Sequence, residues 1–143
     1  MRPQSIVMFE RLFLASLAIS AINTFIVFDG VARQLAADES VLRLGLGSGF
    51  LIGLLGASFA IYLLLWYLIA RKAANVAKWI LVIFVVLGVL ASIPALSQAS
   101  LDFASLSGVA AVLLEVAALV YLFRADASAW FKGERAAEPA VFD

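Results

Sequence analysis

The stretch GVAAVLLEVAALVYLF, residues 108–123, is an apolar segment with one carboxyl group, Glu115, near its middle. A helix of about 20 mostly apolar residues is long enough to cross the hydrocarbon core of a bilayer. A segment that crosses lipid alone must satisfy its own backbone hydrogen bonds, so we interpret it as a transmembrane helix. The segment therefore predicts a membrane protein with an acidic side chain at membrane depth.

Three further windows share this apolar character, which gives four predicted spans at about residues 12–28, 50–70, 79–96 and 106–123. Their apolar runs are continuous, which excludes the alternating strands of a membrane barrel. We expect an all-α polytopic membrane protein: an antiparallel four-transmembrane-helix bundle with residues 1–132 as a single domain. Residues 133–143 are short, polar at first and predicted to form a flexible C-terminal tail.

The composition supports the membrane class and excludes several others. Of 143 residues, 65% are hydrophobic and 14% charged, and the mean hydropathy is +1.09. Lys plus Arg equals Asp plus Glu at 10 each, so no net charge points to nucleic acid. The sequence has no Cys and no His, which removes thiol chemistry and the commonest metal ligand. We expect no enzyme activity, no cofactor and no metal site.

Basic residues are concentrated in every second segment outside the predicted spans. Eight of the ten lie in the N-terminal segment, the second connection and the C-terminal segment: Arg2, Arg11, Arg71, Lys72, Lys78, Arg124, Lys132 and Arg135. Because positive charge is retained on the cytoplasmic side, both termini are predicted to be cytoplasmic. An aromatic belt is expected at the same interface: Trp66, Tyr67, Trp79, Tyr121 and Trp130. Glu10 and Arg11 there are interpreted as an interfacial anchor or as a docking contact with the second connection.

The second span carries a row of small residues at spacings of three and four: Gly45, Gly49, Gly53, Gly56 and Ala60. On a helix they share one face and allow another backbone to approach closely. Two interpretations stay open, packing inside the bundle and the seam of a homo-oligomer. The other flank carries Ser58, Tyr62 and Trp66.

The first span has its own polar stripe, which comprises Ser16, Ser20, Asn23 and Thr24. Interhelical hydrogen bonds that stabilise the bundle are the favoured interpretation of both polar sets.

On the fourth span, Gly108, Ala111 and Ala118 share the face of Glu115, and the opposite face is larger and apolar: Leu106, Leu113 and Val120. We therefore expect Glu115 to point into the bundle, at the depth of Ser20, Ser58 and Tyr62. No basic residue lies at this depth, and a charge there is costly. We predict a protonated carboxylic acid that donates a hydrogen bond to Ser20, Ser58 or a backbone carbonyl.

Three roles stay open for Glu115: neutral structural contact, proton or cation exchange site, and contact to another subunit. The sequence LLEVAAL around it resembles the glutamate segment of small multidrug resistance transporters, in which a dimer binds protons and cationic drugs alternately. That family's glutamate lies on its first helix and this one on the fourth, so the resemblance implies a mechanism by analogy. Tyr62 and Trp66 would supply aromatic walls for a cation.

The opening of the chain carries Arg2, Pro3 and Ser5, then the pair Phe9-Glu10, and then Ile22-Asn23; the closing segment is YLFRADASAWFKG. Both resemble a group of short, uncharacterised bacterial four-span inner-membrane proteins, which implies the fold and the topology. We expect an accessory or assembly component of the bacterial inner membrane, with a small proton-coupled carrier that uses Glu115 as the alternative. The expected partners are the lipid bilayer and either a second copy or a larger membrane complex.

Overall fold

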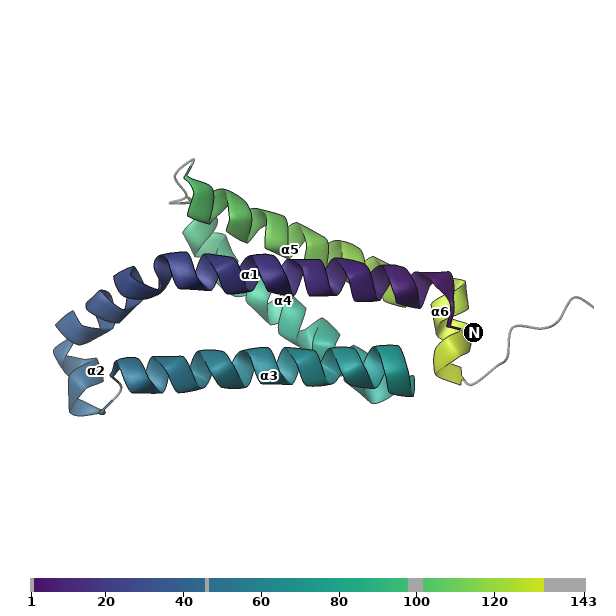
Figure 1. Ribbon diagram of the computed structural model, residues 1–143, viewed down its shortest axis with the longest axis horizontal. Coiled ribbons are helices and arrows are strands. Elements are labelled where there is room, and N and C mark those ends of the chain that lie inside the picture. The colour runs from purple at the N-terminus through teal and green to yellow at the C-terminus, as the bar shows by residue number, and fades with distance from the viewer. Residues whose placement is uncertain (1, 46, 98–101, 133–143) are drawn as a thin grey trace, which may run out of the picture.

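The computed structural model describes residues 2–45, 47–97 and 102–132, and within these ranges it contains helices and no strand. In chain order the helices are α1 (Gln4–Ala37), α2 (Glu39–Arg43), α3 (Ser48–Lys72), α4 (Asn75–Ser97), α5 (Phe103–Leu122) and α6 (Ala125–Lys132). Figure 1 shows α1 and α5 side by side, with α4 crossing between this pair and α3. The predicted all-α class is confirmed.

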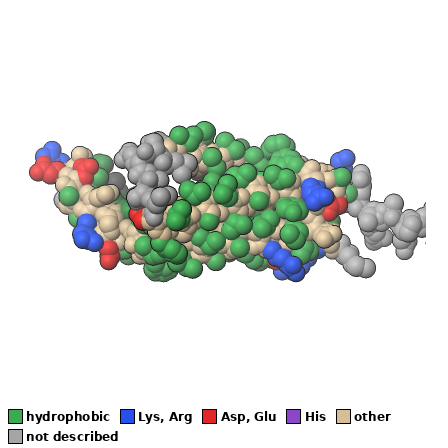
Figure 2. All heavy atoms as spheres, turned by 90° about the horizontal axis from the view of Figure 1, so that it is seen from above, with side chains coloured by type: hydrophobic (Ala, Val, Ile, Leu, Met, Phe, Trp, Pro, Cys, Tyr) green, Lys and Arg blue, Asp and Glu red, His purple; other side chains and the backbone are tan. Residues whose placement is uncertain are grey.

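Four of these helices are long and apolar enough to cross a membrane: α1, α3, α5 and the Asn75–Ile93 part of α4. On the face that Figure 2 shows, apolar side chains cover the middle of the molecule and charged side chains gather towards its two ends. This distribution matches a bilayer with a hydrocarbon core and polar surfaces. The protein is a multi-pass membrane protein.

The helices extend beyond the apolar windows, most of all α1, which has 34 residues. The window 12–28 ends where charged residues begin, but the next residues include Ala, Gln, Arg and Leu, which are all good helix formers. The helix therefore continues to Ala37, and the short α2 follows it. The predicted tail, residues 133–143, lies outside the described residues.

The packing core lies towards one end of the molecule. Its fully buried side chains include Ile6, Phe9 and Phe13 of α1, Ile69 of α3, Leu81 of α4 and Leu122 of α5. α1 and α5 form the most extensive helix contact, and α3 contacts α1 and α4 less. We call this the basic end, because six described basic residues lie there: Arg2, Arg71, Lys72, Lys78, Arg124 and Lys132. The opposite end, which carries α2, is called the α2 end.

Local sequence explains two helix termini. Asp102 precedes α5, and its side chain accepts a hydrogen bond from the Ser105 N–H at 2.7 Å, which satisfies one of the free amides of the first turn. α3 ends at Lys72, and Ala73 directly after it takes the left-handed conformation with φ 50°. The Ala74 N–H then donates to the Leu68 carbonyl at 3.1 Å, so the chain turns back directly into α4.

Candidate functional site

The small-residue face of α5 is covered by α1, as its sequence pattern predicts. Ala111 and Ala118 are buried, and a Cβ added at Gly108 would lie 3.4 Å from the Asn23 side-chain nitrogen of α1. The opposite face is open, with Leu106, Leu113 and Val120 between 56% and 64% exposed. The orientation predicted for this face of α5 is therefore confirmed.

Glu115 lies on this face and is half-buried. Its carboxyl group is close enough to the Tyr62 hydroxyl of α3 for an electrostatic interaction. The Tyr62 ring in turn packs against Phe13 of α1, with centroids 6.1 Å apart, and against Phe84 of α4 at 6.2 Å. Tyr62 thus contacts side chains of α1 and α4 and interacts electrostatically with Glu115 of α5, and we call these two residues the Tyr62–Glu115 site.

Among the described residues Glu115 forms no hydrogen bond with Ser20 or Ser58, so the bond predicted to these two serines is not found. The Ser58 hydroxyl donates instead to the Leu54 carbonyl of its own helix at 2.8 Å. This acceptor is always within reach of a helical serine, whereas a bond across helices needs the right rotation of both. Ser20 is half-buried and Trp66 has a buried indole N–H with no hydrogen-bond partner in the described ranges. Of the five candidates, the structure brings Glu115 and Tyr62 together.

The polar stripe of α1 faces α5, but its hydrogen bonds do not cross to that helix. The Ser16 hydroxyl is buried and donates to the Phe13 carbonyl at 2.8 Å. The Asn23 side-chain oxygen is buried and has no hydrogen-bond partner among the described residues. The small side chains of the stripe therefore allow close packing, and interhelical hydrogen bonds are not what holds this pair together.

The glycine face of α3 has no neighbour among the described residues at its three helical glycines. A Cβ built at Gly49, Gly53 or Gly56 meets nothing within 4 Å, and Ala60 is exposed. Packing of this face inside the bundle is therefore not observed among the described residues. Gly45 does not belong to it, because Gly45 precedes α3 in a turn with φ 71°. A glycine at this position relieves the strain that a side chain would suffer in the left-handed region.

Polar contacts collect at the basic end instead. The Glu10 carboxylate pairs with Arg2 at 2.5 Å and with Arg71 at 3.2 Å, so the docking contact considered for Glu10 is present and joins α1 to α3. Asp126 of α6 accepts two hydrogen bonds from Ser5, one from its N–H at 3.0 Å and one from its hydroxyl at 2.7 Å. These bonds hold the pKa of Asp126 below its usual range.

Lys78 is 7% exposed and sits among aromatic rings. Its ammonium lies 4.8 Å from the Phe131 ring centroid, 4.9 Å from Phe123 and 5.5 Å from Trp79. No ion pair of Lys78 occurs within the described ranges. The rings attract the cation through their electron-rich faces, so Lys78 connects α4 to the junction of α5 and α6.

Sequence reasoning missed α6 and its contacts with the beginning of α1. A helix signal was present, because Asp126 opens and Lys132 closes an eight-residue segment, the charge order that complements a helix dipole. The partner of Asp126 lies 121 residues away in the chain, and no local pattern identifies it.

No family model matches the chain, and no curated protein or solved structure matches it.

Proposed function

We propose that this protein is an accessory or assembly component of the bacterial inner membrane, without catalytic activity of its own, that packs against a second membrane helix through α3. The observation that carries this proposal is the uncovered part of α3. The buried residues of this helix, Leu65, Ile69 and Ala70, all lie in its last third. In the first two thirds, a Cβ added at Gly49, Gly53 or Gly56 would meet no described part of the chain within 4 Å.

The physical reason lies in how helices associate in lipid. Lipid tails are as apolar as leucine, so association depends on close packing, which small residues allow. α3 is anchored at the basic end by the Arg71–Glu10 ion pair and the buried Ile69. The glycine face of its remaining length is thus positioned by the bundle and open to a partner.

We further propose an antiparallel bundle with both termini in the cytoplasm. Supporting this, the described basic residues of the N-terminal segment, the second connection and α6 gather at the basic end. The α2 end has Arg33 and Arg43, and Arg43 pairs with Glu39 at 3.3 Å. A cytoplasmic basic end satisfies the positive-inside rule.

The test uses single-cysteine variants, because the natural chain has no cysteine. Gly53→Cys in native membranes is expected to give one crosslinked product of defined mass with a short thiol-reactive crosslinker. A product of twice the chain mass would identify a second copy, and a heavier one a subunit of a larger complex. Leu113→Cys is the matched control, since Leu113 lies on the open apolar face of α5.

A second variant checks that the crosslink reports packing and not random encounter. Gly53→Leu, added to a cysteine at Gly56, should abolish the product because leucine prevents close approach. Equal crosslinking from Gly53→Cys and Leu113→Cys, or a product that survives Gly53→Leu, would contradict the proposal.

A proton-coupled carrier is the second candidate, and the Tyr62–Glu115 site favours it. Glu115 is half-buried, lies within electrostatic range of the Tyr62 hydroxyl, and forms no hydrogen bond or ion pair with another described residue. A carboxyl group without a fixed partner is free to exchange a proton for an organic cation, with the Tyr62 ring as one wall.

Glu115→Gln tests this second function. In liposomes with an acidic interior, the carrier is expected to drive uptake of tetraphenylphosphonium, and the variant should lose the pH-driven uptake while it remains folded. Glu39→Gln is the control, because Glu39 is exposed at the α2 end. Uptake by the natural protein no greater than by empty liposomes excludes the carrier.

A further inference from the structure

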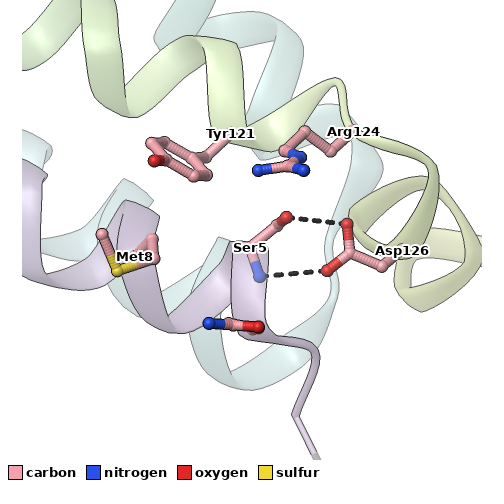
Figure 3. A pocket seen from close by; sticks show the side chains of 6 residues that line it. Ser5, Met8, Tyr121, Arg124 and Asp126 are labelled. Carbon is pink, nitrogen blue, oxygen red and sulfur yellow. Dashed lines mark hydrogen bonds between the residues drawn. The ribbon is translucent and has the colours of Figure 1, made fainter.

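A pocket of about 390 Å³ lies at the basic end, where α1 begins and α5 passes into α6. It is lined by Gln4, Ser5, Met8, Tyr121, Arg124 and Asp126. Figure 3 shows the Arg124 guanidinium and the Asp126 carboxylate beside Ser5, with Tyr121 and Met8 on the other side. The volume is in the range of pockets that hold small ligands, about 300–1,000 Å³.

The pocket presents one positive and one negative group that do not neutralise each other. In the described part of the chain Arg124 and Asp126 form no ion pair. The guanidinium carbon of Arg124 lies 5.6 Å from the centroid of the Tyr121 ring. This contact leaves the N–H groups of Arg124 available as donors, because the guanidinium interacts with the ring through charge and not through a hydrogen bond.

Asp126 is held in place with acceptor capacity to spare. Each of its oxygens accepts one hydrogen bond from Ser5, and an ionised carboxylate has about four acceptor positions. Because Ser5 is buried, the carboxylate is anchored to α1. A second donor can therefore bind it without displacing the first.

The position of the pocket places it at the membrane surface. α5, the last helix long and apolar enough to span the membrane, ends at Leu122, and Arg124 and Asp126 follow directly. Met8 provides an apolar wall next to these charges. A ligand held here would place charged groups at headgroup level and have hydrocarbon within reach.

We propose that this pocket binds the headgroup of a phospholipid that carries a primary ammonium, that is, an ethanolamine phospholipid. The phosphate is bound by Arg124, whose planar fork of donors suits phosphate oxygens. The ammonium donates to Asp126. The two charges of the headgroup thus match the two charges of the pocket, and net charge is balanced on both sides.

This arrangement predicts discrimination among headgroups. A choline headgroup has the same two charges but no ammonium N–H to donate to Asp126. A glycerol headgroup has a phosphate but no ammonium, so Asp126 would receive no cation from this ligand. Ethanolamine phospholipid should therefore bind about tenfold more tightly than either, the difference expected from one charge-assisted hydrogen bond.

The experiment is native mass spectrometry of the full-length protein in mild detergent. Dioleoyl phosphatidylethanolamine, dioleoyl phosphatidylcholine and dioleoyl phosphatidylglycerol are each added in titration, and bound lipids are counted. We expect one molecule of the ethanolamine lipid to bind, at about tenfold lower concentration than either of the other two lipids. Free phosphoethanolamine is added as a competitor; it should displace the lipid poorly, because it lacks the hydrocarbon part.

Variants assign the binding to the pocket. Arg124→Gln and Asp126→Asn should each weaken ethanolamine lipid binding about tenfold, and Asp126→Asn should remove the preference over choline. Arg43→Gln is the matched control at the α2 end and should change nothing. Ser5→Ala removes one bond to Asp126 but leaves both charges, so it should retain the ethanolamine preference.

Measurements on the natural protein and on one variant can overturn the proposal. Equal affinity for the choline and ethanolamine lipids would do so, as would tighter binding of the glycerol lipid, which would make the pocket a simple anion site. Displacement by free phosphoethanolamine at an affinity equal to the lipid would refute the lipid assignment. Unchanged binding in folded Arg124→Gln would refute the location.

Discussion

The small-residue faces of α3 and α5 are similar in sequence and different in what lies on them. On α5 the face is covered by α1, with Ala118 fully buried and Gly108 opposite Asn23. On α3 the corresponding glycines have no neighbour within 4 Å, and Ala60 is exposed. Spacing of small residues thus indicates where a backbone can approach, but it does not identify which backbone does so.

The two ends of the molecule also differ in whether their polar residues contact another helix. At the basic end, ion pairs and hydrogen bonds join α1 to α3 and α6, and the apolar core is adjacent. At the α2 end the polar contacts between described residues are local, such as Arg43 with Glu39 and Ser40 with Asp38. The bundle is therefore fastened at the basic end.

The largest expected effect comes from substituting alanine by leucine on each small-residue face. Ala118→Leu forces extra methylene groups into a fully buried site between α5 and α1, which should lower the free energy of unfolding by about 1–3 kcal/mol. Ala60→Leu meets open space and should change it by no more than about 0.5 kcal/mol. Unfolding titrations of the isolated protein with sodium dodecyl sulfate in mixed micelles measure both.

The same pair of variants separates fold from assembly. Ala60→Leu should leave the stability of the isolated chain unchanged and weaken the α3 crosslink in native membranes. Ala118→Leu should destabilise the isolated chain moderately and leave the α3 crosslink unchanged. A loss of stability in Ala60→Leu equal to that of Ala118→Leu would mean that both faces are covered within one chain.

The sequence was sufficient for the four long helices and for the rotation of α5, because large residues at Leu106, Leu113 and Val120 leave one possible buried face. It was insufficient where the prediction assumed regular helix. Gly45 shares the spacing of Gly49 and Gly53, but its φ of 71° places it in a turn. The sequence also did not predict that the Ser58 hydroxyl donates to the Leu54 carbonyl of its own helix.

The contacts of the basic end were the least predictable part. Ser5 and Asp126, or Glu10 and Arg71, are distant in sequence, and their meeting depends on how far α1 and α3 extend past the apolar windows. Charge alone indicated that Glu10 could dock on the second connection, but it did not distinguish this from contact with lipid headgroups. Only the position of α6 brings Arg124 and Asp126 into one pocket.

An effect of intermediate size is expected from breaking one ion pair at each end. Glu10→Gln removes a carboxylate that is 15% exposed and paired with both Arg2 and Arg71, and it should lower the free energy of unfolding by about 1 kcal/mol. Glu39→Gln breaks a pair whose side chains are 81% and 85% exposed, and its effect should be about 0.3 kcal/mol or less. Detergent unfolding at low ionic strength measures both, and equal effects would contradict the distinction between the ends.

The smallest expected effect concerns acid titration of Asp126 and Asp38, one at each end. Hydrogen bonds hold the pKa of both carboxyls below the usual range, from Ser5 in the first case and from Ser40 in the second. A carboxyl with a lowered pKa in the folded state stabilises that state above its unfolded pKa, about 3.9, and loses this contribution as the pH falls through the folded pKa.

The consequences of this titration differ because the partners differ. Ser5 belongs to α1 and Asp126 to α6, so protonation weakens a tertiary contact; Ser40 is two residues from Asp38, so protonation there affects only the start of α2. Unfolding measured between pH 6 and pH 3 should show a loss of less than about 1 kcal/mol, since Asp126 is exposed. Asp126→Asn should reduce this pH dependence and Asp38→Asn should retain it. If Asp38→Asn abolished the dependence instead, the α2 end would be the coupled one, and the contrast between the ends would be reversed.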